Sequence, residues 1–299
     1  MRTLDRRSGA VLACGCGRRY PVVDGIPIVM TDPLPDLVGA VERELPPDVT
    51  ALLVETAPED APYSRLVDHL AVYLDAHWGD RADPPVALGA HALVQKIAER
   101  SSARVKLAVE LGCSVGRIVA ELAAGADHVV GLDIQLATLR RARHLLAGAP
   151  VGYARRVVGR HFVPAHAVTE PVDNVSLVCG DALDPPLVHG FYDRVVALNL
   201  LDNVAQPRQL LAVVDGLCAP GGEVILATPY AWQSHVAEAD RIGGDAPARE
   251  LVALLREGRG LGAPYEIVDE ATLTWDLRRD ARCTISYRTH YVRARKRGT

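Results

Sequence analysis

The chain has 299 residues, 49% of them hydrophobic, which is enough for one large α/β domain and a small additional module. Its net charge is −4 at pH 7 and its isoelectric point is near 6.2, so there is no global basic field and nucleic acid is not a favoured partner. Residues 1–9 are polar, no apolar run approaches the roughly 18 residues of a membrane helix, and the six cysteines are scattered. We therefore expect a cytoplasmic protein with reduced thiols and no membrane partner.

The first 60 residues predict a small β module followed by a linker. Short strands are expected at residues 11–14, 19–23 and 26–30. The pair Asp24-Gly25 is typical of a hairpin turn, and Pro27, which cannot donate to a ladder, indicates an edge strand. A connector rich in proline and aspartate follows over residues 31–60, with a short helix expected near residues 37–45.

From Ser64 the spacing of apolar residues becomes helical. Leu66, Leu70 and Tyr73 fall on one face of a first helix, and Gly79 ends it. Residues 91–99 predict a second helix. We therefore expect a helical lid over residues 61–104, at the start of a second domain that covers residues 61–299.

Strands and helices alternate along the rest of the chain. Strands are expected at residues 105–111, 128–132, 175–179, 194–198, 224–227, 265–268 and 283–292. Helices are expected at residues 117–124, 136–146 and 209–217, and once more after Tyr230. Such alternation implies crossover connections and a parallel sheet covered on both faces. The predicted fold class is α/β, with a doubly wound, mainly parallel sheet of seven strands.

A glycine turn follows the first strand of this domain. The segment Glu110-Leu-Gly-Cys-Ser-Val-Gly116 runs from a buried strand into a helix, and Gly112 lets a ligand approach the backbone closely. A dinucleotide fingerprint would have a glycine where Ser114 stands, so contact with a pyrophosphate is disfavoured. Glu110 also disfavours a phosphate and would suit the ammonium of an amino-acid ligand.

Two further carboxylates follow the next two strands. Asp133, with Ile134 after it, is placed to accept both hydroxyls of a ribose, and Asp181, with Ala182 after it, is placed to accept an adenine amine. Alone, such an acid often caps a helix and such a glycine turn is often structural. Together the three features mark one crevice at the carboxyl ends of consecutive strands, and they predict S-adenosylmethionine (SAM) as the cofactor.

Residues 105–229 resemble the class I SAM-dependent methyltransferases. Glu110 to Gly116 is similar to their first motif, and Leu217-Cys-Ala-Pro-Gly-Gly222 resembles the turn before their fifth strand. In this family the residue after the fourth strand often lines the methionine end of the cofactor. The resemblance implies a cofactor site made of Glu110, Gly112, Cys113, Gly116, Asp133, Ile134, Asp181, Ala182, Asn199 and Leu200.

A closer likeness covers most of residues 64–294. The segments that carry it are residues 73–79, 112–117, 199–202, 227–232 and 242–244. Together they resemble the methyltransferase domain of ovothiol synthases, which methylates an imidazole nitrogen of a thiolated histidine. The resemblance implies N-methylation of an imidazole-like small molecule. Because the iron-dependent, sulfur-inserting part has no counterpart here, we expect a stand-alone methyltransferase.

Residues 12–28 resemble a shortened zinc-ribbon-like module, of the kind that accompanies some tRNA and protein methyltransferases. A structural zinc site needs four ligands, usually as two cysteine pairs. This segment offers Cys14-Gly-Cys16 and no second pair. We therefore expect no bound metal, and a remnant fold that packs on the catalytic domain.

Candidate acceptor-site residues follow the fourth and fifth strands. Asp202 is placed to accept a proton or orient a substrate N–H, or equally to cap a helix starting near Asn203. Tyr230 and Trp232 are placed to wall a flat acceptor, or else to pack in the core. Cys113, in the glycine loop, is expected to be a small buried side chain rather than a nucleophile. The lid adds ring residues that could close over the site: Tyr63, Tyr73, His77 (equally expected at the surface) and Trp78.

The favoured function is therefore a SAM-dependent N-methyltransferase whose partner is a small-molecule substrate, with a homodimer as the assembly considered. One alternative is an acceptor of another kind, such as a peptide, a tRNA or a natural product, although the low isoelectric point argues against tRNA. A second is a SAM-binding partner subunit without catalysis. A third, a nicotinamide dehydrogenase, is disfavoured by Ser114 in place of the middle glycine.

Overall fold

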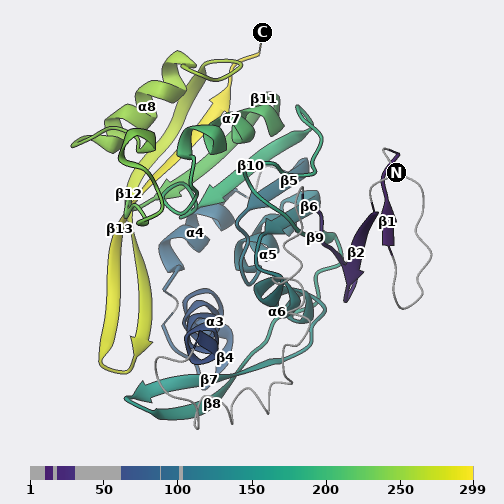
Figure 1. The fold of residues 1–299 in the computed structure, drawn as a ribbon, viewed down its shortest axis with the longest axis vertical. Helices are drawn as coiled ribbons and strands as arrows, with labels where there is room; N and C mark the ends of the chain where they lie inside the picture. The colour runs from purple at the N-terminus through teal and green to yellow at the C-terminus, as the bar shows by residue number, and fades with distance from the viewer. Residues whose placement is uncertain (1–10, 16–18, 31–61, 88, 101–103, 299) are drawn as a thin grey trace.

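A seven-stranded sheet forms the centre of the protein (Figure 1). The computed structural model describes residues 11–15, 19–30, 62–87, 89–100 and 104–298, with the side chains of residues 62–68 and 100 excepted. The strand order is β12-β13-β11-β10-β5-β6-β9. These strands are β5 (Val105–Leu111), β6 (Ala126–Asp133), β9 (Val175–Cys179), β10 (Tyr192–Leu198), β11 (Cys218–Thr228), β12 (Tyr265–Asp280) and β13 (Cys283–Lys296). The pairs among β11, β10, β5, β6 and β9 are parallel, and β13 is antiparallel to both β11 and β12, so the predicted fold class is confirmed.

The sheet divides the core into two parts. On β5, Ala108 packs into one hydrophobic cluster and Val109 into the other, because successive side chains of a strand point to opposite faces. One face is covered by α4 (His91–Arg100), α5 (Arg117–Ala123) and α6 (Leu136–Leu146), and the other by α7 (Pro207–Leu217) and α8 (Pro247–Glu257). Burial on both faces explains why the central strands read as nearly continuous apolar runs.

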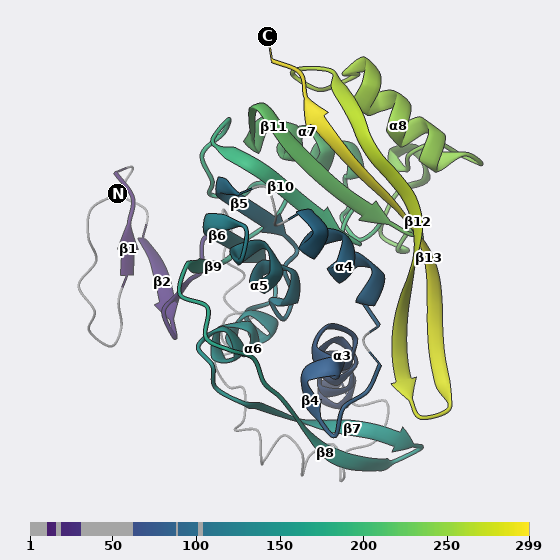
Figure 2. The ribbon, with the colours of Figure 1, turned by 180° about the vertical axis from the view of Figure 1, so that it is seen from behind.

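The predicted lid begins with α3 (Pro62–Trp78) and the short 3-10 helix η1 (Gly79–Arg81), and α4 follows. Helix α3 lies outside the two sheet-covering layers, where it packs against β12 and β7 (Val151–Val158) (Figure 2). Asp75 of α3 binds Arg155 of β7 at 2.8 Å and Arg278 of β12 at 3.2 Å. The lid is therefore anchored by charged contacts to segments far away in the sequence.

Two hairpins depart from the predicted pattern. Strands β7 and β8 (His161–Ala167) form a hairpin that, with β4 (Ala82–Asp83), makes a separate three-stranded sheet, and the sequence had not predicted these strands. The β12–β13 hairpin continues far past its predicted strand of residues 265–268. Both extensions lie beyond the central sheet, where they pack on α3 and on each other, since Ala281 N donates to Val157 O at 3.0 Å. Packing between segments far apart in the sequence stabilises both hairpins. The local pattern of apolar residues therefore predicted their strands only weakly.

The N-terminal module consists of β1 (Val11–Ala13), β2 (Arg19–Val23) and β3 (Ile26–Pro27), with the predicted turn at Asp24 and Gly25. Ile28 forms a parallel bridge to Cys179 at the edge of the main sheet, and Val29 N donates to Cys179 O at 2.8 Å. The expected linker over residues 31–60, its helix near residues 37–45, and Cys16 lie outside the described residues. Within the described part of the chain, no helix is long and apolar enough to cross a membrane.

Candidate functional site

The glycine loop after β5 has the backbone that a close ligand requires. Gly112 has φ 76°, and a Cβ at this position would lie 3.1 Å from Leu200 Cδ1. The amides of Gly112 and Cys113 both donate to Leu132 O, at 2.7 and 3.0 Å, which fixes the loop on β6. Gly116 has φ 79°, and a Cβ there would lie 2.9 Å from Ala142 Cβ, so this glycine serves the packing of α5 against α6.

The strand-end carboxylates are oriented by backbone amides. Asp133 Oδ2 accepts from Ser114 N and Oδ1 accepts from Gln135 N, both at 2.8 Å, which ties the second strand end to the glycine loop. Asp181 Oδ1 accepts from Leu183 N at 2.8 Å. Each carboxylate keeps further lone pairs, so each can still accept hydrogen bonds from a ligand.

Glu110 and Asn199 carry buried polar atoms that lack partners among the described residues. Glu110 is 3% exposed and its Oε2 is unpaired, and neither Nδ2 nor Oδ1 of Asn199 has a partner. Burial, with Asp133 nearby, raises the pKa of Glu110 well above its usual value. Buried polar groups are nearly always satisfied in native proteins, so this pair indicates a polar ligand. Asn199 also has φ 50°, a left-handed backbone conformation that is rare in residues other than glycine and occurs preferentially at functional sites.

A cavity of about 520 Å³ opens at these strand ends. The predicted cofactor residues that line it are Glu110, Gly112, Asp133, Ile134, Asp181, Ala182, Asn199 and Leu200. Cys113 and Gly116 were predicted with them but do not line the cavity. Cys113 is buried in the hydrophobic cluster on the α5 side of the sheet, as its alternative role expected, and Gly116 faces α6. The predicted residues that do line the cavity fit SAM. They combine the unpaired carboxyl oxygen of Glu110 and the unpaired amide of Asn199 with the strand-end acids Asp133 and Asp181.

Asp202 lines the cavity, and its alternative role as a helix cap is wrong. Helix α7 begins at Pro207 with Gln206 as its N-cap, four residues after Asn203, where a cap at Asp202 would require it to start. The Asp202 carboxylate instead accepts from Thr228 Oγ1 at 3.0 Å and from Ala231 N at 3.1 Å. It thereby joins the loop after β10 to the loop after β11, and burial raises its pKa.

Tyr230 and Trp232 do not line the cavity, in contrast to the prediction that they wall the acceptor. Tyr230 Oη lies 2.7 Å from His290 Nδ1, and the rings of Tyr230 and Trp232 are 6.0 Å apart on the α7–α8 side of the sheet. Pro229, Ala231 and Gln233 line the cavity instead. Strand β11 ends at Thr228 and Tyr230 has φ 56°, so a left-handed turn, and not a continued strand, sets which side chains of this loop face the cavity.

The lid contributes rings to the cavity wall. Tyr73 and His77 line it as predicted candidates, and His69, which the sequence analysis missed, lies one turn earlier on α3. His77 is 7% exposed, so its alternative as a surface residue is wrong. Trp78 is buried away from the cavity, and the side chain of Tyr63 lies outside the described residues. The spacing of four between His69, Tyr73 and His77 was a helical signal that could have identified the group.

The β12–β13 hairpin supplies the rest of this wall. Trp275, Leu277 and Tyr287 line the cavity, and Trp275 pairs with Tyr287 across the two strands. Sequence reasoning missed all three residues. Trp275 and Leu277 lie in an extension of β12 that was not predicted. Tyr287 lies within the predicted strand of residues 283–292, but its sequence pattern did not connect it with a site formed much earlier in the chain.

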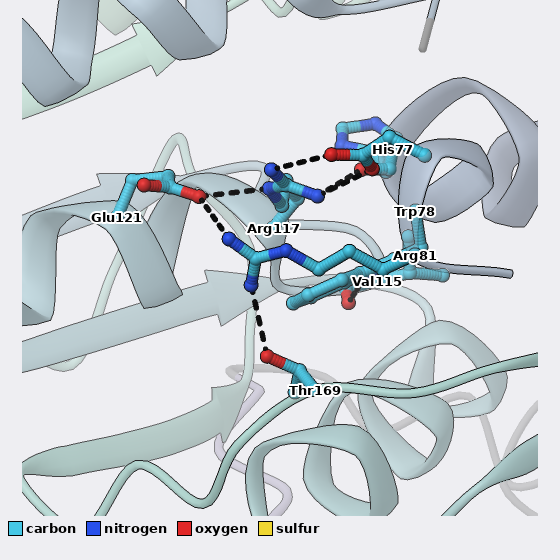
Figure 3. A network of polar contacts seen from close by, with 8 residues as sticks. His77, Trp78, Arg81, Val115, Arg117, Glu121 and Thr169 are labelled. Carbon is cyan, nitrogen blue, oxygen red and sulfur yellow. Dashed lines mark hydrogen bonds and ion pairs between the residues drawn. The ribbon is translucent and has the colours of Figure 1, made fainter. Parts of the chain in front are cut away.

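A network of polar contacts joins the lid to the glycine loop (Figure 3). Arg117, in the first turn of α5, donates to both oxygens of Asp80 at 2.8 and 3.1 Å and to His77 O at 3.3 Å. The Trp78 ring lies 5.1 Å from the Arg117 guanidinium, and Trp78 Nε1 donates to Val115 O at 2.9 Å. The C-terminal end of α3 is thus held directly against the loop that carries Gly112.

Comparisons with known proteins agree with this geometry. Residues 109–226 match a family model described as a methyltransferase domain. A ubiquinone biosynthesis O-methyltransferase from Pectobacterium carotovorum is 27% identical over 143 residues, which are 46% of this chain and 50% of that protein. An uncharacterized methyltransferase from Mycobacterium tuberculosis is 27% identical over 120 residues, or 40% of this chain and 49% of that protein. The chain thus spans about half the length of these curated relatives.

Solved structures include the N-methyltransferase NodS from Bradyrhizobium japonicum WM9, at 15% identity and a TM-score of 0.45 over 80% of this chain and 99% of that one. Residues 109–226 thus match a methyltransferase domain, and the order of the seven strands is that of the class I methyltransferase fold. SAM is the cofactor that such a domain binds. The likeness to ovothiol synthases, the zinc-ribbon likeness and the expectation of no bound metal stay predictions.

Proposed function

We propose that the protein transfers the methyl group of SAM to a small planar acceptor, and that an imidazole of the thiohistidine type is the first candidate. The observation that carries the proposal is that one cavity joins two chemically different walls. The strand ends contribute Glu110, Asp133 and Asp181, and the lid and hairpin contribute rings such as Tyr73 and Trp275. The first wall suits a cofactor with ammonium, ribose and adenine groups, and the second suits a flat ring.

The residues of the first wall have separate tasks in this proposal. Glu110 and Asn199 would hold the amino-acid end of SAM, since their unpaired atoms need polar partners. Asp133 would accept the ribose hydroxyls, and Asp181 would hold the adenine, with the exposed side chain of Ile134 lining the same cavity. When bound, SAM supplies an already activated methyl group. The protein therefore has mainly to orient the acceptor and exclude water.

The acceptor side needs orientation more than a strong base. A neutral imidazole nitrogen is nucleophilic near pH 7, because the free ring has a pKa of about 6.5. The Asp202 carboxylate lines the cavity while it accepts from Thr228 and Ala231, and it has lone pairs left to orient an acceptor N–H. The Asp202 carboxylate, held between the loops after β10 and β11, would thus orient the acceptor toward the methyl donor.

A second candidate is methylation of a phenolic hydroxyl. The matched relatives include ubiquinone biosynthesis O-methyltransferases, and Asp202 at the cavity wall could accept the hydroxyl proton. The same rings would pack against either acceptor, so the chemistry of the transferred proton distinguishes the two. A peptide acceptor and a SAM-binding subunit without catalysis are the remaining alternatives, and the homodimer stays a prediction.

Two measurements test the proposal. Calorimetry should detect SAM binding, and Asp133→Ala should weaken it by about 1.5–3 kcal/mol, the range for hydrogen bonds to a charged group. Asp133→Asn, which keeps one accepting oxygen, should lose less. Mass spectrometry should then detect SAM-dependent methylation in a panel of histidine, thiolated histidines, phenols and cell extract. SAM binding without any methylated product would support the non-catalytic alternative.

A further inference from the structure

One face of α3 forms a column of rings along the cavity. The ring centroids of His69 and Tyr73 lie 4.5 Å apart, those of Tyr73 and His77 lie 6.0 Å apart at 17°, and His77 meets Trp275 of β12 edge-on at 5.2 Å. All four residues line the cavity. His69 is exposed, Tyr73 half-buried and His77 buried, so the column runs from the cavity mouth toward its floor.

We propose that this column, with Trp275 across it, is the acceptor subsite, and that it selects a flat ring that is neutral or cationic. The inference rests on the proposed methyl transfer and adds the substrate class and the residues that recognise it. Rings offset or tilted against one another at these distances pack favourably, and an acceptor ring can join the same arrangement.

The charge of the cavity supports this selection. Glu110, Asp133, Asp181 and Asp202 all line it, and among the described lining residues there is neither lysine nor arginine. An acceptor with a net negative charge would face these acidic groups, Asp202 on the acceptor side among them, with no lysine or arginine in the described wall to pair with, at a cost in desolvation and repulsion. A neutral ring avoids this cost, and a cationic group on the acceptor would gain from the same carboxylates.

The polar atoms of the column stay uncharged at neutral pH. Burial, together with nearby acidic groups that include Asp133 and Asp202, raises the pKa of Tyr73, so its hydroxyl remains a donor. Burial and the positive charge of Arg117 lower the pKa of His77 to about 3. His77 Nδ1 is buried with no hydrogen-bond partner among the described residues, so the ring still has a nitrogen that a hydrogen bond could satisfy. A neutral imidazole forms that hydrogen bond without repelling a cation.

The column is also fixed relative to the cofactor loop. Trp78, next to His77 in the chain, donates to Val115 O, and Arg117 donates to His77 O, as Figure 3 shows. These contacts hold the floor of the column against the loop that begins at Gly112. A ring bound there would therefore have a defined position relative to the methyl donor, which is what in-line transfer requires.

Matched probes test the selection for charge. The full chain is saturated with S-adenosylhomocysteine, and calorimetry measures the binding of histamine against 3-(imidazol-4-yl)propionate, and of tyramine against 3-(4-hydroxyphenyl)propionate. Within each pair the ring is the same and the side-chain charge is reversed. In at least one pair the amine should bind roughly tenfold tighter or more. Equal or inverted affinities, or no binding of any probe, would overturn the inference.

Variants test the column itself. His77→Phe keeps a ring but removes both nitrogens, and Tyr73→Leu removes a ring from a half-buried position. Each should weaken binding of the preferred amine by roughly fivefold or more and leave S-adenosylhomocysteine affinity within about twofold. His91→Phe, at an exposed position of α4 away from the cavity, is the matched control. If His77→Phe does not fold, Tyr73→Leu carries the test.

Two results would separate this inference from the proposed function. Unchanged probe affinity in the folded column variants would remove the subsite, and joint loss of probe and S-adenosylhomocysteine would assign the column to the cofactor. In both cases, methylation of any extract compound by the wild-type chain would leave the proposed methyl transfer standing.

Discussion

The two walls of the cavity are held in place by different interactions. The strand-end wall is positioned by main-chain hydrogen bonds, in which Gly112 and Cys113 donate to Leu132 O and Ser114 donates to Asp133. The lid wall is positioned by buried side-chain charges, in which Asp75 binds Arg155 and Arg278. A wall built on the main chain depends on backbone conformation. A wall built on one buried carboxylate depends on that single side chain.

The Asp75 cluster gives the comparison its largest expected effect. Asp75 and Arg155 are 5% and 4% exposed, and Tyr153 Oη also donates to Asp75 Oδ1, at 2.5 Å. Asp75→Ala would leave the Arg155 charge buried and short of its partner, so we expect a loss of about 3–5 kcal/mol in the free energy of unfolding. Urea denaturation followed by far-UV circular dichroism measures it.

A surface pair provides the control for this variant. Asp127 binds Arg104 at 2.7 Å, but both side chains are more than half exposed. Asp127→Ala should therefore cost at most about 1 kcal/mol. If the two variants cost the same, the lid is not held by the Asp75 cluster.

On the strand-end wall the strongest expected effect is at Gly112. A side chain there would require φ 76° and would stand 3.1 Å from Leu200, on the side where the cavity lies. Gly112→Val should therefore reduce SAM affinity by more than roughly a hundredfold in calorimetry, through steric overlap with the cofactor and backbone strain. Gly190→Val shares the strain, with φ 67°, but has nothing within 4 Å of its added Cβ, so it should bind SAM like the wild type.

Asp202 lines the cavity from the strand-end side, and its charge acts on Tyr73 of the lid, so a substitution there tests whether cofactor binding and acceptor binding are separate functions. Asp202→Asn can keep the contacts to Thr228 and Ala231, because an amide both donates and accepts. We expect kcat/KM to fall roughly tenfold and SAM affinity to stay within about twofold, since the residue is assigned to the acceptor. Parallel loss of SAM binding and turnover would instead assign Asp202 to the cofactor site or to the fold.

The smallest effect concerns the pH dependence of stability and comes from Glu110. Its folded-state pKa is raised by burial, so the folded chain retains a proton that the unfolded chain releases, and stability falls as pH rises from the unfolded to the folded pKa. Glu110→Gln should remove this loss, making the cofactor-free protein more stable than the wild type at pH 8 and nearly equal at pH 4.

SAM should reverse the order of stability at pH 8, so that the wild type becomes more stable than Glu110→Gln. The ammonium of SAM would favour the ionised Glu110 of the wild type, whereas the variant offers it no carboxylate. Thermal melts at both pH values, with and without SAM, measure the two signs. If Glu110→Gln is no more stable than the wild type at pH 8, ionising the buried Glu110 does not destabilise the cofactor-free protein.

The sequence predicted most of the strand-end wall for a local reason. Glycines, acids and the strand–turn–helix pattern stand within a few residues of one another at Glu110–Gly116, at Asp133 and at Asp181, and parallel strands bring their carboxyl ends to one edge. Two residues predicted for that wall do not line the cavity. Cys113 and Gly116 belong to the same motif, but the turn directs them toward the core and α6.

The lid wall was predicted only in part, because it is assembled over long distances in the chain. The helical period placed α3 correctly and supplied Tyr73 and His77, but Trp275 comes from an extension of β12 that the sequence did not signal. Tyr287 lies in a predicted strand, but the sequence did not indicate that its side chain reaches the cavity. Likewise, the orientation of Tyr230 depends on its hydrogen bond to His290, 60 residues away.

By itself, then, the sequence determined the α/β sheet, the glycine turn and the acids that follow its strands, because backbone conformation and apolar periodicity are local properties. Only the tertiary structure decided which rings face the cavity and which charges hold them. Those choices follow from burial and ion pairing between α3, the β7–β8 hairpin and the β12–β13 hairpin, and such pairing between distant segments leaves no periodic trace in either segment.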